Sequence, residues 1–526
     1  MLVLKKSVWK YLAVSFCMLV LLAGCGGSGG DKTDGSKDAA SAKKDELRIA
    51  VSANPPSLDA QIANSNITAQ IGYHIFEPLF AMDGNFEPQP VLADSYEVSE
   101  DGKVYTIKLL KGVKFHNGKE MTADDVVASL SRWVKDSQKA STLIGGSTFE
   151  KVDDYTVKMT ANEASSDVIT VLANPIMFAA IYPAEIVEKA GEKGISEYIG
   201  TGPYKLADWK QDQYIELEKF DDYKVRENAT TGLAGKKTAA TDKLVFDIVT
   251  DASTRIAGAK NGQYDIVEEV PQDNYEELEK ASNLKLDVTK GGTLNLFLNT
   301  TVGIMEKQDM RQAVLAALNM DDILLASYGN KKLFEENPGW FNPEDTQWGS
   351  EAGKEYYNQN DPDKAKELLK KAGYNNEKLV LVTTPDYPEM YNATLVVQEQ
   401  LKKVGINAEV ESYDFSTFME HRADPNQCSM FITSNSYNVL PIQLTVLDKT
   451  WAGMDRPEVT DGIKAMRSAN SQEEAKAAWD DLQGFIYEYG GATVLGHFTG
   501  VNAVSNNVDG YEYMRFPIFW NATVSE

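Results

Sequence analysis

The chain contains few of the side chains that usually carry out covalent chemistry. Its histidines stand far apart, at His74, His116, His421 and His497. No Gly-x-Ser-x-Gly nucleophile elbow lies between an expected strand and an expected helix, and no His-Glu-x-x-His zinc helix occurs. Paired carboxylates stay possible, because 78 acidic residues make chance pairs unavoidable. We therefore expect a protein that is not an enzyme, with a secreted hydrolase as an alternative that substrate turnover would establish.

Resident metals and cofactors have no candidate site in the sequence. No closely spaced set of histidines and cysteines occurs. A Gly-x-Gly-x-x-Gly match at 24–29 has no strand before it and no helix after it, so it predicts no dinucleotide site. The net charge of −26 opposes a nucleic-acid partner. We expect no catalytic residue, no bound metal and no cofactor.

A positively charged and then apolar segment opens the chain. Lys5, Lys6 and Lys10 precede an apolar run at 11–22, which is shorter than the roughly 20 residues that cross a bilayer. Such a segment is typical of an export signal. The run ends in Leu-Ala-Gly-Cys, which resembles the lipobox of bacterial lipoproteins. This resemblance implies that a signal peptide at 1–24 is removed and that Cys25 is lipidated, as by palmitate; the alternative is an ordinary signal peptide with a chance cysteine.

A lipid on Cys25 would hold the protein outside the cytoplasm, on the outer face of the cell membrane or on its periplasmic side in a Gram-negative cell. Two or more acyl chains give stable anchoring. Residues 25–46 are rich in Gly, Ser, Asp and Lys without an apolar period, which predicts a flexible tether. With Cys17 removed and Cys25 modified, Cys428 has no disulfide partner. We expect Cys428 to be a small buried apolar residue.

The first half of the chain has a clear β-hairpin followed by a helix. Strand-like segments at 94–99 and 103–109 flank an Asp-Gly pair, which tolerates the positive φ angles of a tight turn. Thr122 then precedes helical spacing of apolar residues, and Asp125 stands three positions later. This pair predicts a capping box at a helix start.

The second half alternates strands and helices. An Asp-Pro pair at 361–362 and Gly373 are typical of the start and end of a helix. Segments at 379–382, 391–404 and 407–411 then read as strand, helix and strand. This order predicts an α/β lobe with a right-handed crossover.

A series of motifs in fixed order is the most specific feature of the sequence. They are Ile-Phe-Glu-Pro-Leu at 75–79, Ser-Glu-Asp-Gly at 99–102, Lys-Gly-Val-Lys-Phe-His-Asn-Gly at 111–118, Thr-Ala-Asp-Asp-Val at 122–126, Gly-Thr-Gly-Pro-Tyr-Lys at 200–205, Gly-Gln-Tyr-Asp-Ile at 262–266 and Arg-Gln-Ala-Val-Leu-Ala-Ala-Leu at 311–318. In these residues the chain resembles the bacterial family 5 extracellular solute-binding proteins, which serve peptide and nickel ABC importers. The motifs with His116 and Gly-Thr-Gly-Pro-Tyr are expected to form turns and not to touch a ligand.

The resemblance implies an α/β two-lobe clamshell of the periplasmic-binding-protein type (type II, cluster C), with a discontinuous first lobe that carries an extra subdomain. By position, the first lobe is placed at 47–75, 191–290 and 491–526, its extra subdomain at 76–190, and the second lobe at 291–490. Four glycines lie near the two expected crossings between the lobes: Gly291, Gly292, Gly490 and Gly491. They are candidate hinges, because glycine absorbs φ/ψ changes without steric cost; alternatively, both pairs merely end strands.

A free peptide presents an ammonium and a carboxylate, and a closing cleft must pair both charges. Many dipeptide binders of the resembled family supply the acid from a Trp-x-x-Asp-like segment, whose counterpart here, 430–438, has neither Trp nor Asp. An arginine often found before the following helix has no match around 384–387. The chain thus departs from the family where a zwitterionic dipeptide would be held.

The remaining candidate ligand-binding residues are neutral or aromatic. They are Thr433, Ser434, Asn435, Tyr437, Tyr387 and Trp451 in the second lobe, and Asn54 and Ser57 after the first strand. This set suits an amide-rich ligand, a longer peptide held by its backbone, or a modified amino acid; alternatively, 433–437 form a strand and turn remote from the cleft.

The function that these observations favour is capture of a small ligand, foremost a peptide or peptide-like solute, for the permease subunits of an ABC importer. Contacts from both lobes would stabilise the closed form of a monomer, as a population shift. A metal-chelate binding protein of the nickel type is the alternative, because a chelate needs few protein ligands.

Overall fold

The computed structural model describes residues 43–63, 65–191, 193–227, 230–342, 346–448, 451, 453–469 and 471–526. The signal segment, Cys25 and most of the expected tether lie outside these residues. The end of that tether, residues 43–46, belongs to the folded part: the Lys44 backbone N–H donates to the Val524 carbonyl at 2.9 Å, and Lys44 Nζ lies 3.0 Å from Asp265 Oδ1. Within the described ranges, no helix has both the length and the apolar character needed to cross a bilayer.

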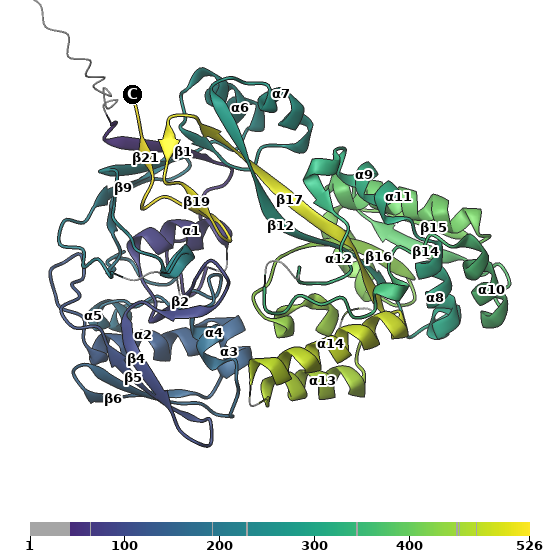
Figure 1. Ribbon diagram of the computed structural model, residues 1–526, viewed down its shortest axis with the longest axis horizontal. Coiled ribbons are helices and arrows are strands. Elements are labelled where there is room, and N and C mark those ends of the chain that lie inside the picture. The colour runs from purple at the N-terminus through teal and green to yellow at the C-terminus, as the bar shows by residue number, and fades with distance from the viewer. Residues whose placement is uncertain are drawn as a thin grey trace, which may run out of the picture. The chain divides into compact units, whose positions relative to one another are not determined.

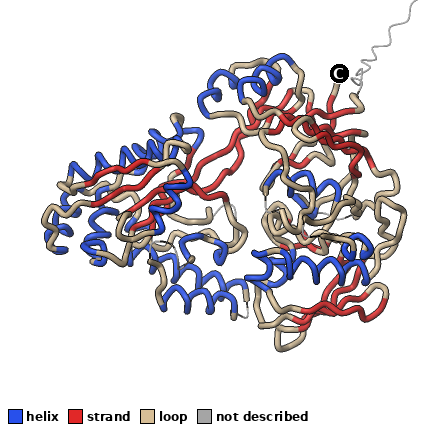
Figure 2. Tube along the Cα trace, turned by 180° about the vertical axis from the view of Figure 1, so that it is seen from behind, coloured by secondary structure: helices blue, strands red, loops and turns tan. Residues whose placement is uncertain are grey.

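Eleven strands of the described residues form one mixed sheet in the order β15-β14-β16-β12-β17-β11-β1-β10-β9-β8, with β13 added on β17. Two strands are far longer than the others, β12 (Leu284–Leu298) and β17 (Ala492–Ser505), and they pair antiparallel. The first half of β12 continues the sheet of the first lobe, and its second half pairs with β16 (Met430–Ser436) of the second lobe. Figures 1 and 2 show this long pair of strands running between the two lobes.

The first lobe is built on the other end of the sheet. Its strands are β1 (Glu46–Val51), β8 (Tyr204–Lys210), β9 (Tyr214–Lys219), β10 (Lys243–Ile248) and β11 (Ile266–Val267), with helices α1 (Asn66–Ile75), α6 (Ala252–Asn261) and α7 (Tyr275–Glu279). β1 pairs parallel with β10 and β11, while β8 to β10 form an antiparallel meander. β1 is the first strand that the sequence places before Asn54.

The extra subdomain has its own four-stranded antiparallel sheet in the order β4-β5-β7-β6. Its elements are β2 (Phe80–Met82), β3 (Pro88–Pro90), β4 (Ala93–Val98), β5 (Val104–Leu109), β6 (Thr148–Asp153) and β7 (Thr156–Thr160), with helices α2 (Ala123–Asp136), α3 (Gln138–Ile144), α4 (Val168–Leu172) and α5 (Ala184–Glu188). The predicted hairpin is confirmed as β4 and β5, with Gly102 at φ +70° in its turn. The predicted capping box is also confirmed, because the Thr122 backbone N–H donates to Asp125 at 2.9 Å.

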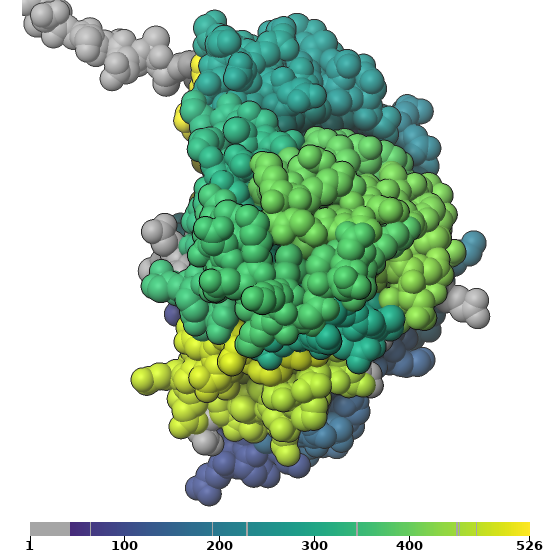
Figure 3. Space-filling model, turned by 90° about the vertical axis from the view of Figure 1, so that its right-hand side faces the viewer, coloured from purple at the N-terminus to yellow at the C-terminus, as the bar shows by residue number. Residues whose placement is uncertain are grey.

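The second lobe is α/β, as its strand and helix order predicts. Its elements are β13 (Phe334–Glu335), β14 (Leu379–Thr383), β15 (Ala408–Ser412), α8 (Gln308–Ala317), α9 (Met320–Tyr328), α10 (Pro362–Ala372), α11 (Pro388–Lys403), α12 (Phe415–Ala423), α13 (Pro457–Arg467) and α14 (Gln472–Tyr489). β14 and β15 pair parallel with α11 between them in the chain, which confirms the predicted β-α-β unit. Gly373 ends α10 at φ +69°. Figure 3 shows this lobe from its outer side, in green.

After β17 the chain ends beside the first lobe. Four short strands follow: β18 (Val508–Asp509) pairs with β21 (Thr523–Val524), and β19 (Glu512–Tyr513) pairs with β20 (Pro517–Ile518). His74 of α1 accepts a hydrogen bond at Nε2 from the Phe519 backbone N–H, 3.1 Å away. The β19–β20 hairpin thereby presents residues 512–515 toward the space described next.

Candidate ligand-binding cleft

A cavity of about 570 Å³ lies against the first half of β12. Its walls come from six segments that are far apart in the sequence: 84–86 and 231–232 of the first lobe, 287–290 of β12, 341–342 with 346 and 437–439 of the second lobe, and 512–515 of the terminal hairpin. The volume lies within the range of roughly 300–1,000 Å³ that is common for small-molecule sites. Because both lobes and a connecting strand contribute, a bound molecule would contact all three.

Arg515 is the guanidinium of this cavity. It comes from the terminal hairpin, and its Nη1 donates to the backbone carbonyl of Tyr437 in the second lobe. Within the described residues no carboxylate lies within 4 Å of it. Desolvation by burial lowers the pKa of Arg515 below its usual value. The arginine is therefore held in place across the cavity without a counter-ion.

Asp287 is a carboxylate of the same cavity, on β12. Its Oδ2 accepts a hydrogen bond of 2.7 Å from the hydroxyl of Tyr511. Burial, followed by the charge of Asp287, strongly raises the pKa of Tyr511, so this hydroxyl stays protonated and donating. Among the described residues no lysine or arginine lies within 4 Å of Asp287, and Asp287 and Arg515 do not pair with each other.

Of the eight predicted ligand-binding residues, the structure brings Tyr437 to this cavity and Asn435 to a small recess beside it. The Tyr437 hydroxyl is hydrogen-bonded to Nδ1 of His497, whose Nε2–H donates to the Gly339 carbonyl at 2.7 Å. Asn435 accepts at Oδ1 from Asn295 Nδ2 at 3.1 Å. Both side chains therefore have fixed orientations.

The other four predicted residues of the second lobe lie away from the cavity lining. Thr433 is buried in β16 opposite Asn295, and Ser434 donates to Glu389 at 3.1 Å. Trp451 packs among Phe297, Phe431 and Arg422, and Tyr387 is exposed against Phe415. Thr433 and Trp451 therefore pack inside the second lobe, Ser434 bonds to a neighbouring helix, and Tyr387 lies at the surface.

The two predicted residues of the first lobe lie in the turn after β1. The Ser57 hydroxyl accepts from the Asp59 backbone N–H at 3.0 Å, and its carbonyl accepts from the Thr68 hydroxyl at 2.7 Å. Asn54 Nδ2 donates to the Pro55 carbonyl, while Asn54 Oδ1 is buried without a partner among the described residues. Neither residue lines the cavity.

The candidate hinge glycines occupy two different environments. Gly291 lies at a register shift of β12, and Gly292 pairs with Phe498 of β17. A Cβ on Gly292 would stand 2.0 Å from the Asn435 carbonyl oxygen, so close strand packing alone requires glycine there. Gly490 instead ends α14 at φ +72°, and Gly491 precedes β17. The hinge role stays a prediction for both pairs.

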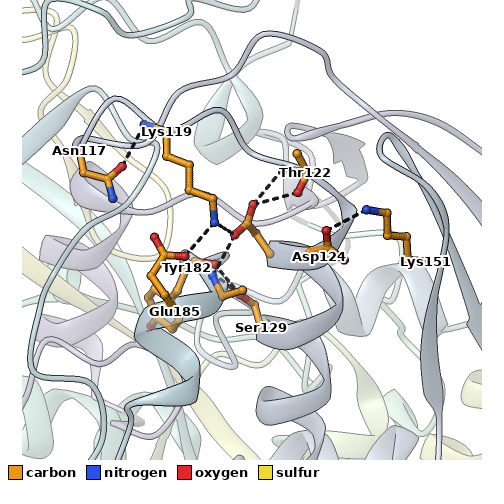
Figure 4. Close-up of polar contacts among 10 residues, drawn as sticks. Asn117, Lys119, Thr122, Asp124, Ser129, Lys151, Tyr182 and Glu185 are labelled. Atoms are coloured by element: carbon orange, nitrogen blue, oxygen red, sulfur yellow. Dashed lines mark hydrogen bonds and ion pairs between the residues drawn. The ribbon is translucent and has the colours of Figure 1, made fainter.

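The family-like motifs around His116 serve the fold of the first lobe. The Gly200 backbone N–H donates to His116 Nδ1 at 3.2 Å, and His116 Nε2 lies 3.0 Å from the Gly202 carbonyl. Burial lowers the pKa of His116 to about 4, so the ring is neutral at pH 7. Figure 4 shows the neighbouring cluster, in which Lys119 pairs with Glu185 at 2.8 Å. As expected, these motifs form turns, and hydrogen bonds between His116 and the backbone of Gly200 and Gly202 connect them.

Direct contacts join the extra subdomain to the second lobe. At the end of α13, Arg467 Nη2 donates to the Leu143 carbonyl at 2.7 Å, and its Nε lies 3.3 Å from Asp167 Oδ2. The Arg467 carbonyl accepts from the Ser166 backbone N–H at 3.1 Å. These contacts connect the extra subdomain to the second lobe through residues outside β12 and β17.

Sequence reasoning missed the charged residues of the cavity. Asp287 stands within an ordinary strand pattern, and Arg515 stands in Tyr-Glu-Tyr-Met-Arg-Phe at 511–516, an aromatic-rich segment without a known motif. The only signal was indirect: the absence of both peptide-binding charges from 384–387 and 430–438 implied that such charges, if present, come from elsewhere.

Comparison with known proteins places this arrangement in a family. Residues 87–445 match the group described as bacterial extracellular solute-binding proteins, family 5. The chain belongs to this family. The predicted two-lobe α/β fold and the predicted solute-binding class are thereby confirmed.

Individual relatives of this family 5 protein cover most of its length. The probable peptide ABC transporter periplasmic-binding protein y4tO of Sinorhizobium fredii is 29% identical over 481 residues, 85% of this chain and 87% of the relative. The glutathione-binding protein GsiB of Pectobacterium atrosepticum is 30% identical over 379 residues, 71% of this chain and 70% of the relative. The crystal structure of the ABC transporter substrate binding protein CtaP from Listeria monocytogenes superposes with a TM-score of 0.79 at 22% identity, covering 92% of this chain and 100% of the other.

Proposed function

We propose that this family 5 protein captures a peptide or peptide-like solute between its lobes and delivers it unchanged to the permease of an ABC importer. The observation that carries the proposal is the cavity of about 570 Å³, whose lining comes from both lobes and from β12. Relatives named as peptide-binding and glutathione-binding support this ligand class.

The mechanism needs no covalent step. A ligand that contacts the first lobe, the second lobe and β12 together stabilises the arrangement in which those walls meet, and the equilibrium shifts toward it. The contacts of Arg467 with the extra subdomain add to the same arrangement without the ligand. The permease would then recognise the closed form.

Solute binding is tested by mass spectrometry of the small molecules that co-purify with the protein, followed by calorimetric titration with pools of short peptides. We expect co-purified peptides or saturable heat from the pools. X-ray scattering should show a smaller radius of gyration on saturation. An unchanged radius would contradict closure, and the absence of binding by every pool would contradict the peptide ligand.

The proposed location is the outer face of the cell membrane, held by a lipid on Cys25. The lipobox at 22–25 supports this part of the proposal. In a Cys25→Ser variant the protein should appear in the soluble extracytoplasmic fraction, whereas the unchanged protein should sediment with membranes. Equal distribution of both proteins would overturn the lipid anchor.

A further inference from the structure

The cavity contains a cation and an anion, Arg515 and Asp287, that have no ion-pair partner among the described residues. Arg515 uses Nη1 for the Tyr437 carbonyl, and within the described residues its Nε and Nη2 have no hydrogen-bond partner. Neither atom is among the fully buried polar atoms that lack a partner, so both keep some accessible surface. Nε and Nη2 form one edge of the guanidinium, with two parallel N–H donors. That edge matches the two oxygens of a carboxylate.

The surroundings of Arg515 favour an anion. Lys139 of α3 is an exposed side chain outside the cavity lining, and the charge of Arg515 lowers the pKa of Lys139, after the larger effect of desolvation. Like Arg515, Lys139 has no carboxylate within 4 Å among the described residues. Two cations that approach each other without a counter-ion raise the local positive potential, and a bound anion would relieve it.

The opposite charge lies on the strand that connects the lobes. Asp287 holds one hydrogen bond, from Tyr511, while a carboxylate offers about four acceptor positions. Nearby Glu268 does not compete as a second anion, because burial raises its pKa to about 8 and it is mainly protonated at pH 7. Asp287 is therefore free to accept an ammonium.

We infer that the cavity selects zwitterionic peptides, with the terminal carboxylate on the Nε–Nη2 edge of Arg515 and the terminal ammonium on Asp287. This inference rests on the proposed function and names the end groups that the ligand must carry. Segments 384–387 and 430–438 lack the arginine and the acid that dipeptide binders of the family often supply there, and this inference places both charges elsewhere. They come from the terminal hairpin and from β12.

The test uses three pools of peptides, two to five residues long and built only from uncharged amino acids: one with free termini, one with amidated C-termini and one with acetylated N-termini. Binding of the purified protein to each pool is measured by native mass spectrometry and calorimetry. We expect each cap to weaken binding about tenfold to a hundredfold. If all three pools bind equally, the end-group assignment is overturned while peptide binding stands. If no pool binds, the proposed peptide function fails and the assignment fails with it.

Variants assign each end group to its residue. In Arg515→Gln the preference over amidated peptides should vanish and the preference over acetylated peptides should remain; in Asp287→Asn the reverse should hold. Arg515→Lys, which keeps the charge but not the parallel donors, should keep part of the preference. Glu512→Gln removes another carboxylate of the cavity lining and serves as the matched control. If Glu512→Gln and not Asp287→Asn abolishes the preference over acetylated peptides, the Asp287 assignment is overturned, and unchanged preferences in Arg515→Gln overturn that of Arg515.

Discussion

Charged side chains have different partners at two places in the molecule: the junction between the first lobe and its extra subdomain, and the cleft. At the junction, Arg132 Nη2 lies 2.6 Å from Asp59 Oδ2, and both side chains are almost completely buried. Asp59 also accepts from the Tyr182 hydroxyl at 3.2 Å and from the Ile195 backbone N–H at 2.9 Å. In the cleft, Arg515 has a carbonyl partner, and no carboxylate of the described residues lies within 4 Å of it. The paired charge of Arg132 serves folding, whereas the unpaired edge of Arg515, which lies in the cavity lining, is available for a ligand.

A second buried pair at the same junction follows the first pattern. Lys237 Nζ lies 2.8 Å from Glu77 Oε1, and both side chains are nearly inaccessible to solvent. Glu77 also accepts hydrogen bonds of 3.0 Å from the hydroxyls of Thr201 and Tyr223. An intact buried pair adds little net stability. Removing one partner lowers the free energy of unfolding strongly, because the other charge stays buried.

The largest effect should come from breaking the junction. Asp59→Ala removes the closest carboxylate from the buried Arg132 guanidinium and leaves it with the Gln61 amide oxygen and the partly exposed Asp136. We expect the free energy of unfolding to fall by about 3–5 kcal/mol. Urea unfolding followed by circular dichroism measures this. Lys114→Ala is the control, because its pair with Asp222 is exposed and contributes about 1 kcal/mol or less. Equal losses in both variants would remove the distinction between the two kinds of charge.

The junction should also lose stability in acid, as should the surroundings of His74 and His497, because burial lowers the pKa of His74 to about 3 and that of His497 to about 4. The unfolded chain protonates His116 near its usual pKa of about 6.5, whereas the folded chain does so only near 4. The stability from keeping this ring neutral is therefore fully present above pH 6.5 and is lost as the pH falls toward 4. Between pH 7 and pH 4, the free energy of unfolding should fall less in His116→Gln than in the unchanged protein. The difference between the two falls should be at most about 3 kcal/mol. Parallel pH profiles of unfolding would show that His116 does not cause the loss.

Contacts between the lobes should affect binding more than folding. Arg467→Ala removes the hydrogen bond to the Leu143 carbonyl and the ion pair with Asp167. We expect about fivefold to thirtyfold weaker binding of the free-terminus peptide pool, because the closed form loses about 1–2 kcal/mol. Arg456→Ala, at the other end of α13, is the matched control. Equal affinities of the two variants would contradict a role of Arg467 in closure.

The fold could be predicted far better from the sequence than the cleft. Local signals such as the capping box of Thr122, the Asp-Gly turn and the helix limits at 361–373 depend on neighbouring residues, and each is confirmed. The large sheet depends on pairings such as Leu284 with Ser505, which no local pattern encodes. The family resemblance supplied this part of the architecture.

The cleft depends on contacts between segments up to several hundred residues apart. Arg515 meets the Tyr437 carbonyl only because β17 returns the chain to the first lobe. Tyr437 itself was predicted for the segment that follows β16, and it does line the cavity. The sequence places Trp451 near that segment, but in the structure its ring packs against Phe297 and Phe431. Proximity in the sequence does not reveal such neighbours in a core.

The smallest effect on binding is expected from a variant that distinguishes the role of the Tyr437 side chain from that of its backbone carbonyl. Tyr437→Phe leaves the carbonyl that accepts from Arg515 but removes the hydroxyl that is hydrogen-bonded to His497. Because His497 Nδ1 is then left buried without that donor, we expect the free energy of unfolding to fall by about 1–2 kcal/mol. If Arg515 keeps its place, peptide affinity should change less than threefold, which corresponds to a binding free energy change of about 0.6 kcal/mol or less. A large loss of affinity with unchanged preference over amidated peptides would instead make the Tyr437 hydroxyl a ligand contact of its own, and the cleft would then bind through neutral groups as well as through charge.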